Sequence, residues 1–198
     1  MNPERDTTYE LISWDKFYRQ CIDLADQIKQ SSFKPNILLG IARGGWVIAR
    51  ILSDLLGIHE VANIRVKFYT DIYKTEREPI ITQPVSLCVE NKEVLLIDDV
   101  SDSGKSLRIA LEHTLAKNST NCKTATIHYK PWSILKPDYF VAETDLWIIY
   151  PHEFYETLNL VAGKMVKEGK TKAEVYQLFV DLGAEKDILQ KFLDEIMP

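Results

Sequence analysis

The sequence lacks the features that mark several large classes of protein. Its three cysteines (Cys21, Cys88 and Cys122) are far apart and its four histidines are not closely paired, so neither a disulfide framework nor a zinc site is expected. No apolar run approaches the roughly 18 residues that a membrane helix needs, and the polar first ten residues lack the apolar core of a signal peptide. We therefore expect a cytoplasmic protein with no membrane partner.

The chain also lacks an excess of positive charge. The chain has 24 lysines and arginines against 29 acidic residues and a net charge of −5, so no basic field is available to hold nucleic acid. Any phosphate site must therefore be local. With 198 residues and 45% hydrophobic content, the chain is long enough for one well-buried core and an appendage.

What the sequence does contain is an apolar strand that leads into a pair of carboxylates. The four apolar residues 94–97 predict a strand buried on both faces, and Asp98 and Asp99 follow where open α/β sheets place their ligands. Small and hydroxyl residues come next, just ahead of an apolar helix expected over residues 107–115. They favour a phosphate cradle at a helix N-terminus, and they are Ser101, Ser103, Gly104 and Ser106.

The main alternative is the Walker loop, which binds nucleoside triphosphates, because Gly104, Lys105 and Ser106 match its last three residues. That loop needs another glycine five residues before Gly104, where this chain has Asp99, and an acid there would repel a triphosphate. Two adjacent carboxylates instead suit vicinal hydroxyls, since each oxygen can accept a hydrogen bond from a ribose 2′-OH or 3′-OH. The residues therefore indicate a ribose that carries a 5′-phosphate.

The whole segment 94–106 resembles the 5-phosphoribosyl-1-diphosphate (PRPP) signature of type I phosphoribosyltransferases. Serines stand at two positions where threonine is more usual, which keeps both hydroxyls. The resemblance implies that Asp98 and Asp99 bind the ribose and that Asp102 is the general base. It assigns the PRPP 5′-phosphate to the turn made of Ser101, Asp102, Ser103, Gly104, Lys105 and Ser106.

A second turn follows the buried strand expected over residues 37–41. In Ala42, Arg43, Gly44 and Gly45, the glycines let the backbone approach a ligand closely, and the arginine can take phosphate oxygens in bidentate fashion. On its own a basic residue before two glycines is weak evidence. Some fifty residues before the PRPP signature, however, it resembles the diphosphate-binding loop of the same family.

Three later positions resemble the base-binding residues of the branch that salvages 6-oxopurines. Lys130 matches the lysine that donates to the exocyclic oxygen of the base, and an ammonium group, which has no acceptor, favours a carbonyl over the amino group of adenine. Trp147 matches the aromatic residue that stacks on the purine, and Ile148 the residue whose backbone reads its edge. Ile149 stands where relatives carry an acid, so the choice among guanine, hypoxanthine and xanthine stays open.

The alternation of strands and helices predicts an α/β fold, with a Rossmann-like parallel sheet flanked by helices. Later strands are expected over residues 124–129 and around 145–150, and Gly57 is expected to end the helix that follows the glycine turn. The loop at about residues 69–84 has no persistent period and is expected to act as a lid, with short strands at its ends and with Lys74 and Arg77 available to close over the diphosphate.

We expect a phosphoribosyltransferase core over residues 1–151 and a helical extension over residues 152–198, whose six lysines against nine acids disfavour nucleic acid. Periodic apolar residues predict three short helices in this extension, with a capping box formed by Thr171 and Glu174.

The resemblance implies a purine salvage enzyme. It would transfer the phosphoribosyl group of PRPP to N9 of a 6-oxopurine with the help of Mg²⁺, and the family suggests a homodimer. Glu153 falls where relatives place an acid near the magnesium shell, although a glutamate at a helix start explains it equally well. The alternatives are a phosphoribosyltransferase for adenine or a pyrimidine, and a non-catalytic regulator that senses PRPP.

Overall fold

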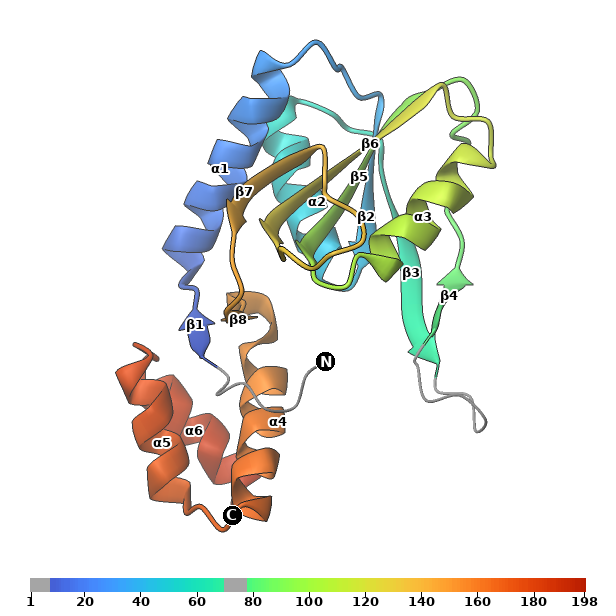
Figure 1. Ribbon diagram of the computed structural model, residues 1–198. Helices are drawn as coiled ribbons and strands as arrows, with labels where there is room; N and C mark the ends of the chain where they lie inside the picture. Colours follow the sequence, from blue (N-terminus) through green and yellow to red (C-terminus); the bar gives the residue numbers. More distant parts are fainter. Residues whose placement is uncertain (1–7, 70–77) are drawn as a thin grey trace. The chain divides into compact units, whose positions relative to one another are not determined.

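The computed structural model describes residues 8–69 and 78–198 (Figure 1). The chain forms two compact units, one of Tyr18–Asp145 and one that combines Met1–Phe17 with Leu146–Pro198. The N-terminal segment thus shares a unit with the C-terminal helices. The functional division that we expect between residues 151 and 152 stays a prediction.

The larger unit is built on a six-stranded sheet in the order β4-β3-β2-β5-β6-β7 (Figure 1). All neighbours are parallel except β3 and β4, which confirms the predicted α/β class. The strands are β2 (Ile37–Ala42), β3 (Val61–Tyr69), β4 (Glu78–Gln83), β5 (Glu93–Ser101), β6 (Asn121–Tyr129) and β7 (Tyr139–Glu143). The helices are α1 (Trp14–Gln30), which begins in the smaller unit, α2 (Gly44–Leu56) and α3 (Lys105–Leu115).

Helices cover both faces of this sheet. On one face, Leu39 and Leu96 share a buried cluster with Leu107 and Ala110 of α3. On the other face, α2 comes so close to β2 that a Cβ added to Gly40 would stand 2.9 Å from the carbonyl oxygen of Gly45. Because both faces are covered, β2 and β5 are apolar over residues 37–41 and 94–97, as the sequence predicts.

Two expected features fall at or next to the segment that the structure does not describe. β3 and β4 pair in antiparallel fashion up to Tyr69 and Glu78, so the strands expected at the two ends of the loop are present. The middle of the expected lid, with Lys74 and Arg77, lies outside the described residues. Its closure over a ligand stays a prediction.

The smaller unit contains a second sheet and the C-terminal helices. β1 (Tyr9–Leu11) pairs in parallel with β8 (Trp147–Ile149), so the strand expected around residues 145–150 does not extend the main sheet. The edge place beside β6 is taken by β7, which the sequence pattern did not reveal. After a 3-10 turn, η1 (Pro151–Glu153), come α4 (Phe154–Lys167), α5 (Lys172–Asp181) and α6 (Lys186–Ile196).

The three helices pack around apolar faces that the periodicity predicts. Leu158, Phe179 and Leu189, one from each helix, are fully buried in one cluster. Thr171 and Glu174 form the expected capping box at the start of α5, and donation from the backbone and hydroxyl of Thr171 and from a neighbouring lysine lowers the pKa of Glu174 to about 2. None of the helices within the described ranges is long and apolar enough to cross a bilayer.

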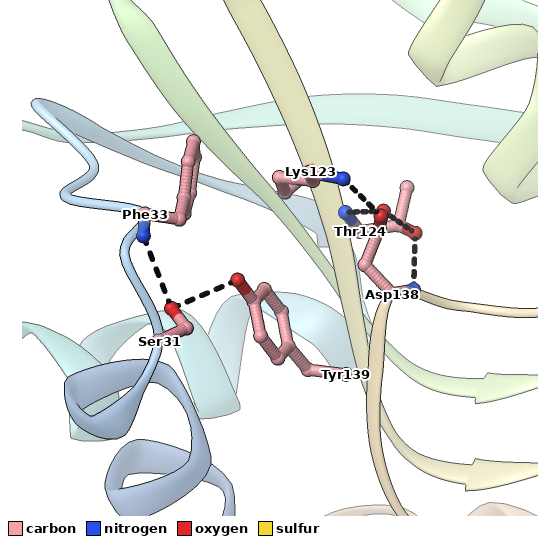
Figure 2. Close-up of polar contacts among 6 residues, drawn as sticks. All are labelled: Ser31, Phe33, Lys123, Thr124, Asp138 and Tyr139. Atoms are coloured by element: carbon pink, nitrogen blue, oxygen red, sulfur yellow. Dashed lines mark hydrogen bonds and ion pairs between the residues drawn. The ribbon is translucent and has the colours of Figure 1, made fainter.

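Asp138 ties the start of β7 to β6. Its carboxylate accepts hydrogen bonds from the Thr124 backbone at 2.8 Å, the Thr124 hydroxyl at 2.9 Å and Lys123 Nζ at 2.7 Å, while its own N–H donates to the Thr124 hydroxyl (Figure 2). Figure 2 also shows Tyr139, whose hydroxyl donates to Ser31 after α1. Burial acts to raise the pKa of Asp138, but these donors outweigh it and hold the pKa below its usual value.

We expect Asp138→Ala to lower the free energy of unfolding by about 1–3 kcal/mol, because the Thr124 N–H loses its acceptor. Since the carboxyl has a lowered pKa in the fold, its contribution is present above the unfolded pKa of about 3.9 and is lost as pH falls through the folded value. Urea unfolding at pH 7 and pH 3 measures both effects. Lys123→Met, which removes only the half-exposed ion pair, should cost less than about 1 kcal/mol; an equal loss in the two variants would contradict this account.

Candidate active site

The candidate site lies where the order of the sheet reverses. From β2 the chain crosses to β3 on one side, and from β5 it crosses to β6 on the other side, while β2 and β5 are neighbours. The two connections therefore leave in opposite directions. In open α/β sheets the crevice at such a switch point is where ligands bind. The loops that open here are the two that the sequence singled out, residues 42–45 and 101–104.

The acidic pair lies inside β5, whereas we had expected it to follow the end of the strand. β5 pairs with β2 only up to Ile97, opposite Gly40, but it continues beside β6 to Ser101. Asp98 and Asp99 therefore occupy a stretch of strand whose partner on the β2 side has already turned away. This difference brings the carboxylates beside the loop that follows β2.

Backbone groups hold both carboxylates. Oδ1 of Asp98 accepts a hydrogen bond from the N–H of Asp99 at 3.0 Å, and Oδ1 of Asp99 accepts one from the N–H of Val100 at 2.7 Å. The backbone N–H of Gly45 also donates to Asp98. Burial, and then the negative charge of Asp99, raises the pKa of Asp98 well above its usual value. The pair therefore resists carrying two full charges without a ligand.

The glycines of the first loop make this approach possible. A Cβ on Gly44 would overlap the carboxylate of Asp99, and a Cβ on Gly45 would overlap the carbonyl of Ile97 and stand 2.8 Å from the Cα of Asp98. The peptide bond between Ala42 and Arg43 is cis, which no feature of the sequence had indicated. The predicted diphosphate loop and the predicted ribose carboxylates are thus in contact.

The second loop forms a tight turn that starts α3. Gly104 has a φ of +76°, a left-handed conformation that favours glycine, and it caps the helix. The backbone N–H of Lys105 points to the hydroxyl of Ser103 at 3.4 Å, while the side chain of Lys105 lies 3.6 Å from Glu78 of β4. The N-terminus of α3 opens at this turn, as a phosphate cradle requires. Its binding of the 5′-phosphate, including a part for Ser106, stays a prediction.

Ser101 differs from the other residues of this turn. Its side chain is buried, lies 2.8 Å from the hydroxyl of Ser133 and donates to the carbonyl of Leu135 at 2.9 Å. We expect this hydroxyl to contact the phosphate, and in the structure it contacts the loop between β6 and β7. Its part in binding the phosphate stays a prediction.

That loop, residues 130–138, packs directly on the turn. The N–H of Lys130 donates to the carbonyl of Ser101 at 3.0 Å, and the N–H of Ile134 donates to the carbonyl of Ser103 at 3.1 Å. A Cβ on Gly104 would stand 2.5 Å from the Ser133 hydroxyl, so a second constraint also requires glycine there. The predicted base-binding Lys130 is therefore brought to the loop that carries Asp102.

A contact that sequence reasoning missed lies at the same place. The indole Nε1 of Trp132 donates to Oδ1 of Asp102 at 3.2 Å, and Lys130 Nζ lies 5.7 Å from the centroid of the Trp132 ring. Lys130 is only 5% exposed, whereas Trp132 is 49% exposed. The only signal in the sequence was that Trp132 follows Lys130 by two positions at the end of a strand.

The remaining predicted residues belong to the smaller unit. Trp147 is 40% exposed on β8, so it is not a core tryptophan, whereas Ile148 is buried and Ile149 packs in the helical cluster. Glu153 ends η1 and is half-buried. The approach of Trp147 and Ile148 to a purine and of Glu153 to a metal stays a prediction.

Comparisons with known proteins show the family to which the chain belongs. Residues 8–156 match the family described as the phosphoribosyl transferase domain. The chain is 29% identical over 161 residues to the xanthine-guanine phosphoribosyltransferase of Gluconobacter oxydans, which covers 80% of this chain and 91% of that protein. It is 32% identical over 147 residues to the enzyme of the same name from Cereibacter sphaeroides, which covers 71% of this chain and 84% of that one.

A solved structure is similar over the same region. The crystal structure of a purine phosphoribosyltransferase from Pyrococcus horikoshii superposes with a TM-score of 0.66 at 34% identity, covering 72% of this chain and 92% of that one. The fold, the switch-point site and these matches together define a phosphoribosyl-transferring enzyme. The chain belongs to the phosphoribosyltransferase family.

Proposed function

We propose that this protein is a purine salvage enzyme that transfers the phosphoribosyl group of PRPP to N9 of a 6-oxopurine. The observation that carries the proposal is the packing of Asp98 and Asp99 against Gly44 and Gly45 at the switch point of the sheet. This arrangement offers carboxylates for a ribose diol beside a loop for a diphosphate. The turn that ends at Gly104 supplies a helix N-terminus for the 5′-phosphate.

The reaction forms the bond between N9 of the purine and C1′ of the ribose while the bond from C1′ to the diphosphate oxygen breaks. The electron pair of the broken bond leaves with the diphosphate, and Arg43 with the neighbouring loop N–H groups stabilises that charge. The carboxylate of Asp102 accepts the proton from N7 as N9 becomes the nucleophile. Nucleoside 5′-monophosphate and diphosphate are the products.

Mg²⁺ fits this site as an ion that the substrate carries. Within residues 8–69 and 78–198, no group of three or more acidic, histidine or cysteine side chains could hold a metal alone. Mg²⁺ is commonly held by one or two carboxylates together with substrate phosphates, and the pair of Asp98 and Asp99 offers these. When bound, the ion supplies positive charge to the diphosphate oxygens. A part for Glu153 belongs to the same proposal.

Lys130 supports a 6-oxopurine as the acceptor. Lys130 is almost completely buried beside the turn that bears Asp102. An ammonium group at this place prefers a carbonyl oxygen of the base to an amino group. The names of the two relatives, xanthine-guanine phosphoribosyltransferases, support the same class of base. The proposal also includes a cytoplasmic location, which cell fractionation tests, and a homodimer, which size-exclusion chromatography tests.

The test is to incubate the protein with PRPP and Mg²⁺ and with guanine, hypoxanthine, xanthine, adenine, uracil or orotate in turn. Chromatography should detect a nucleoside 5′-monophosphate and diphosphate with at least one 6-oxopurine, and chelation of Mg²⁺ should abolish both. Asp99→Asn is expected to lose most of this turnover. Nucleotide from adenine or a pyrimidine alone would overturn the assignment of the base, and PRPP binding without any turnover would favour a PRPP-sensing regulator.

A further inference from the structure

Trp132 joins Asp102 and Lys130, the two residues of the larger unit that we propose act on the purine. Its indole N–H donates to Asp102, and its ring lies beside the ammonium group of Lys130. Half of the residue is exposed, so packing does not account for a tryptophan at this position. An exposed indole with its one donor on a carboxylate has a polar role.

The two loops that Trp132 links are fixed with respect to each other. Hydrogen bonds join Ser101 to Ser133 and Ser103 to Ile134, and Arg108 of α3 donates to the Ile134 carbonyl at 3.1 Å. The backbones of residues 101–104 and 130–135 therefore form one body. An indole anchored on one loop can hold a side chain of the other in a constant position.

The carboxylate of Asp102 needs a contact that keeps it in one position. Asp102 is exposed on the turn, where a carboxylate in water samples several rotamers. A general base is effective only when one oxygen stays within reach of the proton that it takes. The hydrogen bond from Trp132 occupies Oδ1, and the nearby cation limits the tilt of the indole.

We propose that Trp132 is a positioning residue whose indole N–H holds the Asp102 carboxylate in one rotamer, with the other oxygen left to accept the proton of the purine. This inference rests on the proposed function, because it gives Trp132 a share in the proton transfer at Asp102. Trp132 is thereby assigned to the turnover step, and the binding of PRPP is left to the residues of the switch point.

Three variants separate this role from a structural one. Trp132→Phe keeps an aromatic ring and removes the donor. Trp132→His restores a donor, because the ε nitrogen of an imidazole occupies the place of the indole nitrogen in a five-membered ring. The double variant with Asp102→Asn tests whether Trp132 acts through Asp102.

We expect Trp132→Phe to lower kcat about five- to tenfold, within the range of one ordinary hydrogen bond at an exposed position, with the KM for PRPP and the Tm unchanged. Trp132→His should recover most of the loss above pH 7.5. In the Asp102→Asn background, Trp132→Phe should have no further effect. An unchanged or raised kcat in Trp132→Phe, a failure of Trp132→His to recover activity, or losses that multiply in the double variant would each overturn the proposal.

A second measurement does not depend on activity. The indole N–H resonance of Trp132, identified in a ¹⁵N spectrum by its loss in Trp132→Phe, should shift in Asp102→Ala, which removes the acceptor. If the wild-type protein makes no nucleotide with any base, the proposed function has failed by itself. The resonance then decides on the positioning: a shift supports it, and an indole signal that Asp102→Ala leaves in place overturns it.

Discussion

Replacing Asp102 by asparagine is expected to reduce kcat with a 6-oxopurine on the order of 10²–10⁴-fold, because the side chain keeps its size but can no longer accept a proton. The amide oxygen can still receive the hydrogen bond from Trp132, so the loop should keep its conformation. The KM for PRPP should change little, since we propose that Asp98, Asp99 and the turn at Gly104 hold the ribose and phosphate. Steady-state kinetics with saturating purine measures both constants.

The matched control is Asp54→Asn, which makes the same exchange at an exposed position near the end of α2. This variant should keep the wild-type kcat. Nearly full turnover in Asp102→Asn would exclude Asp102 as the base, and the proton would then have to leave the purine by another route. A raised KM with an unchanged kcat would assign Asp102 to substrate binding.

Local sequence patterns predicted much of the fold because they depend on neighbours in the chain. Runs of apolar residues marked β2 and the first part of β5, since a stretch of strand that is buried on both faces is mostly apolar. The capping box at Thr171 marked the start of α5 because a cap is formed by residues three positions apart. Gly57, with a φ of +67°, ends α2 where the pattern placed the end.

The features that were missed depend on partners distant in the sequence. β8 pairs with β1, some 138 positions away in the register of Tyr9 with Trp147, and no local pattern separates such a pairing from an edge of the main sheet. β7 is held by the contacts of Asp138 with Thr124. The end of β5 was placed too early, because pairing with β6 continues after β2 has left.

The candidate site divides in the same way. The residues of the two loops could be predicted because a strand, small residues and a helix follow one another along the chain, and the switch point brings the loops together. The hydrogen bond from Trp132 to Asp102 joins residues thirty positions apart in the sequence. The hydroxyl of Ser101 contacts the hydroxyl of Ser133, which is also distant in the sequence. Residue type alone could not tell a ligand from a support.

The glycines of the first loop should show the largest effects of a single added methyl group. In Gly44→Ala the Cβ meets the carboxylate of Asp99, which must rotate away from its place beside the loop. In Gly45→Ala the Cβ meets the backbone of Ile97 and Asp98, so α2 itself must move from β5. The first substitution should therefore act on the binding of PRPP and the second on the stability of the fold as well.

We expect Gly44→Ala to reduce kcat/KM for PRPP on the order of 10²-fold, since displacement of a positioning group by about 1 Å can cost that much, with a small change in stability. Gly45→Ala should also lower the free energy of unfolding by about 1–3 kcal/mol, as overpacking against a rigid backbone does. Gly163→Ala is the control, because its Cβ meets nothing within 4 Å in the middle of α4, where alanine favours the helix. Kinetics with PRPP and urea unfolding separate the three, and wild-type kcat/KM in Gly44→Ala would mean that Asp99 does not need its observed position to bind the ribose.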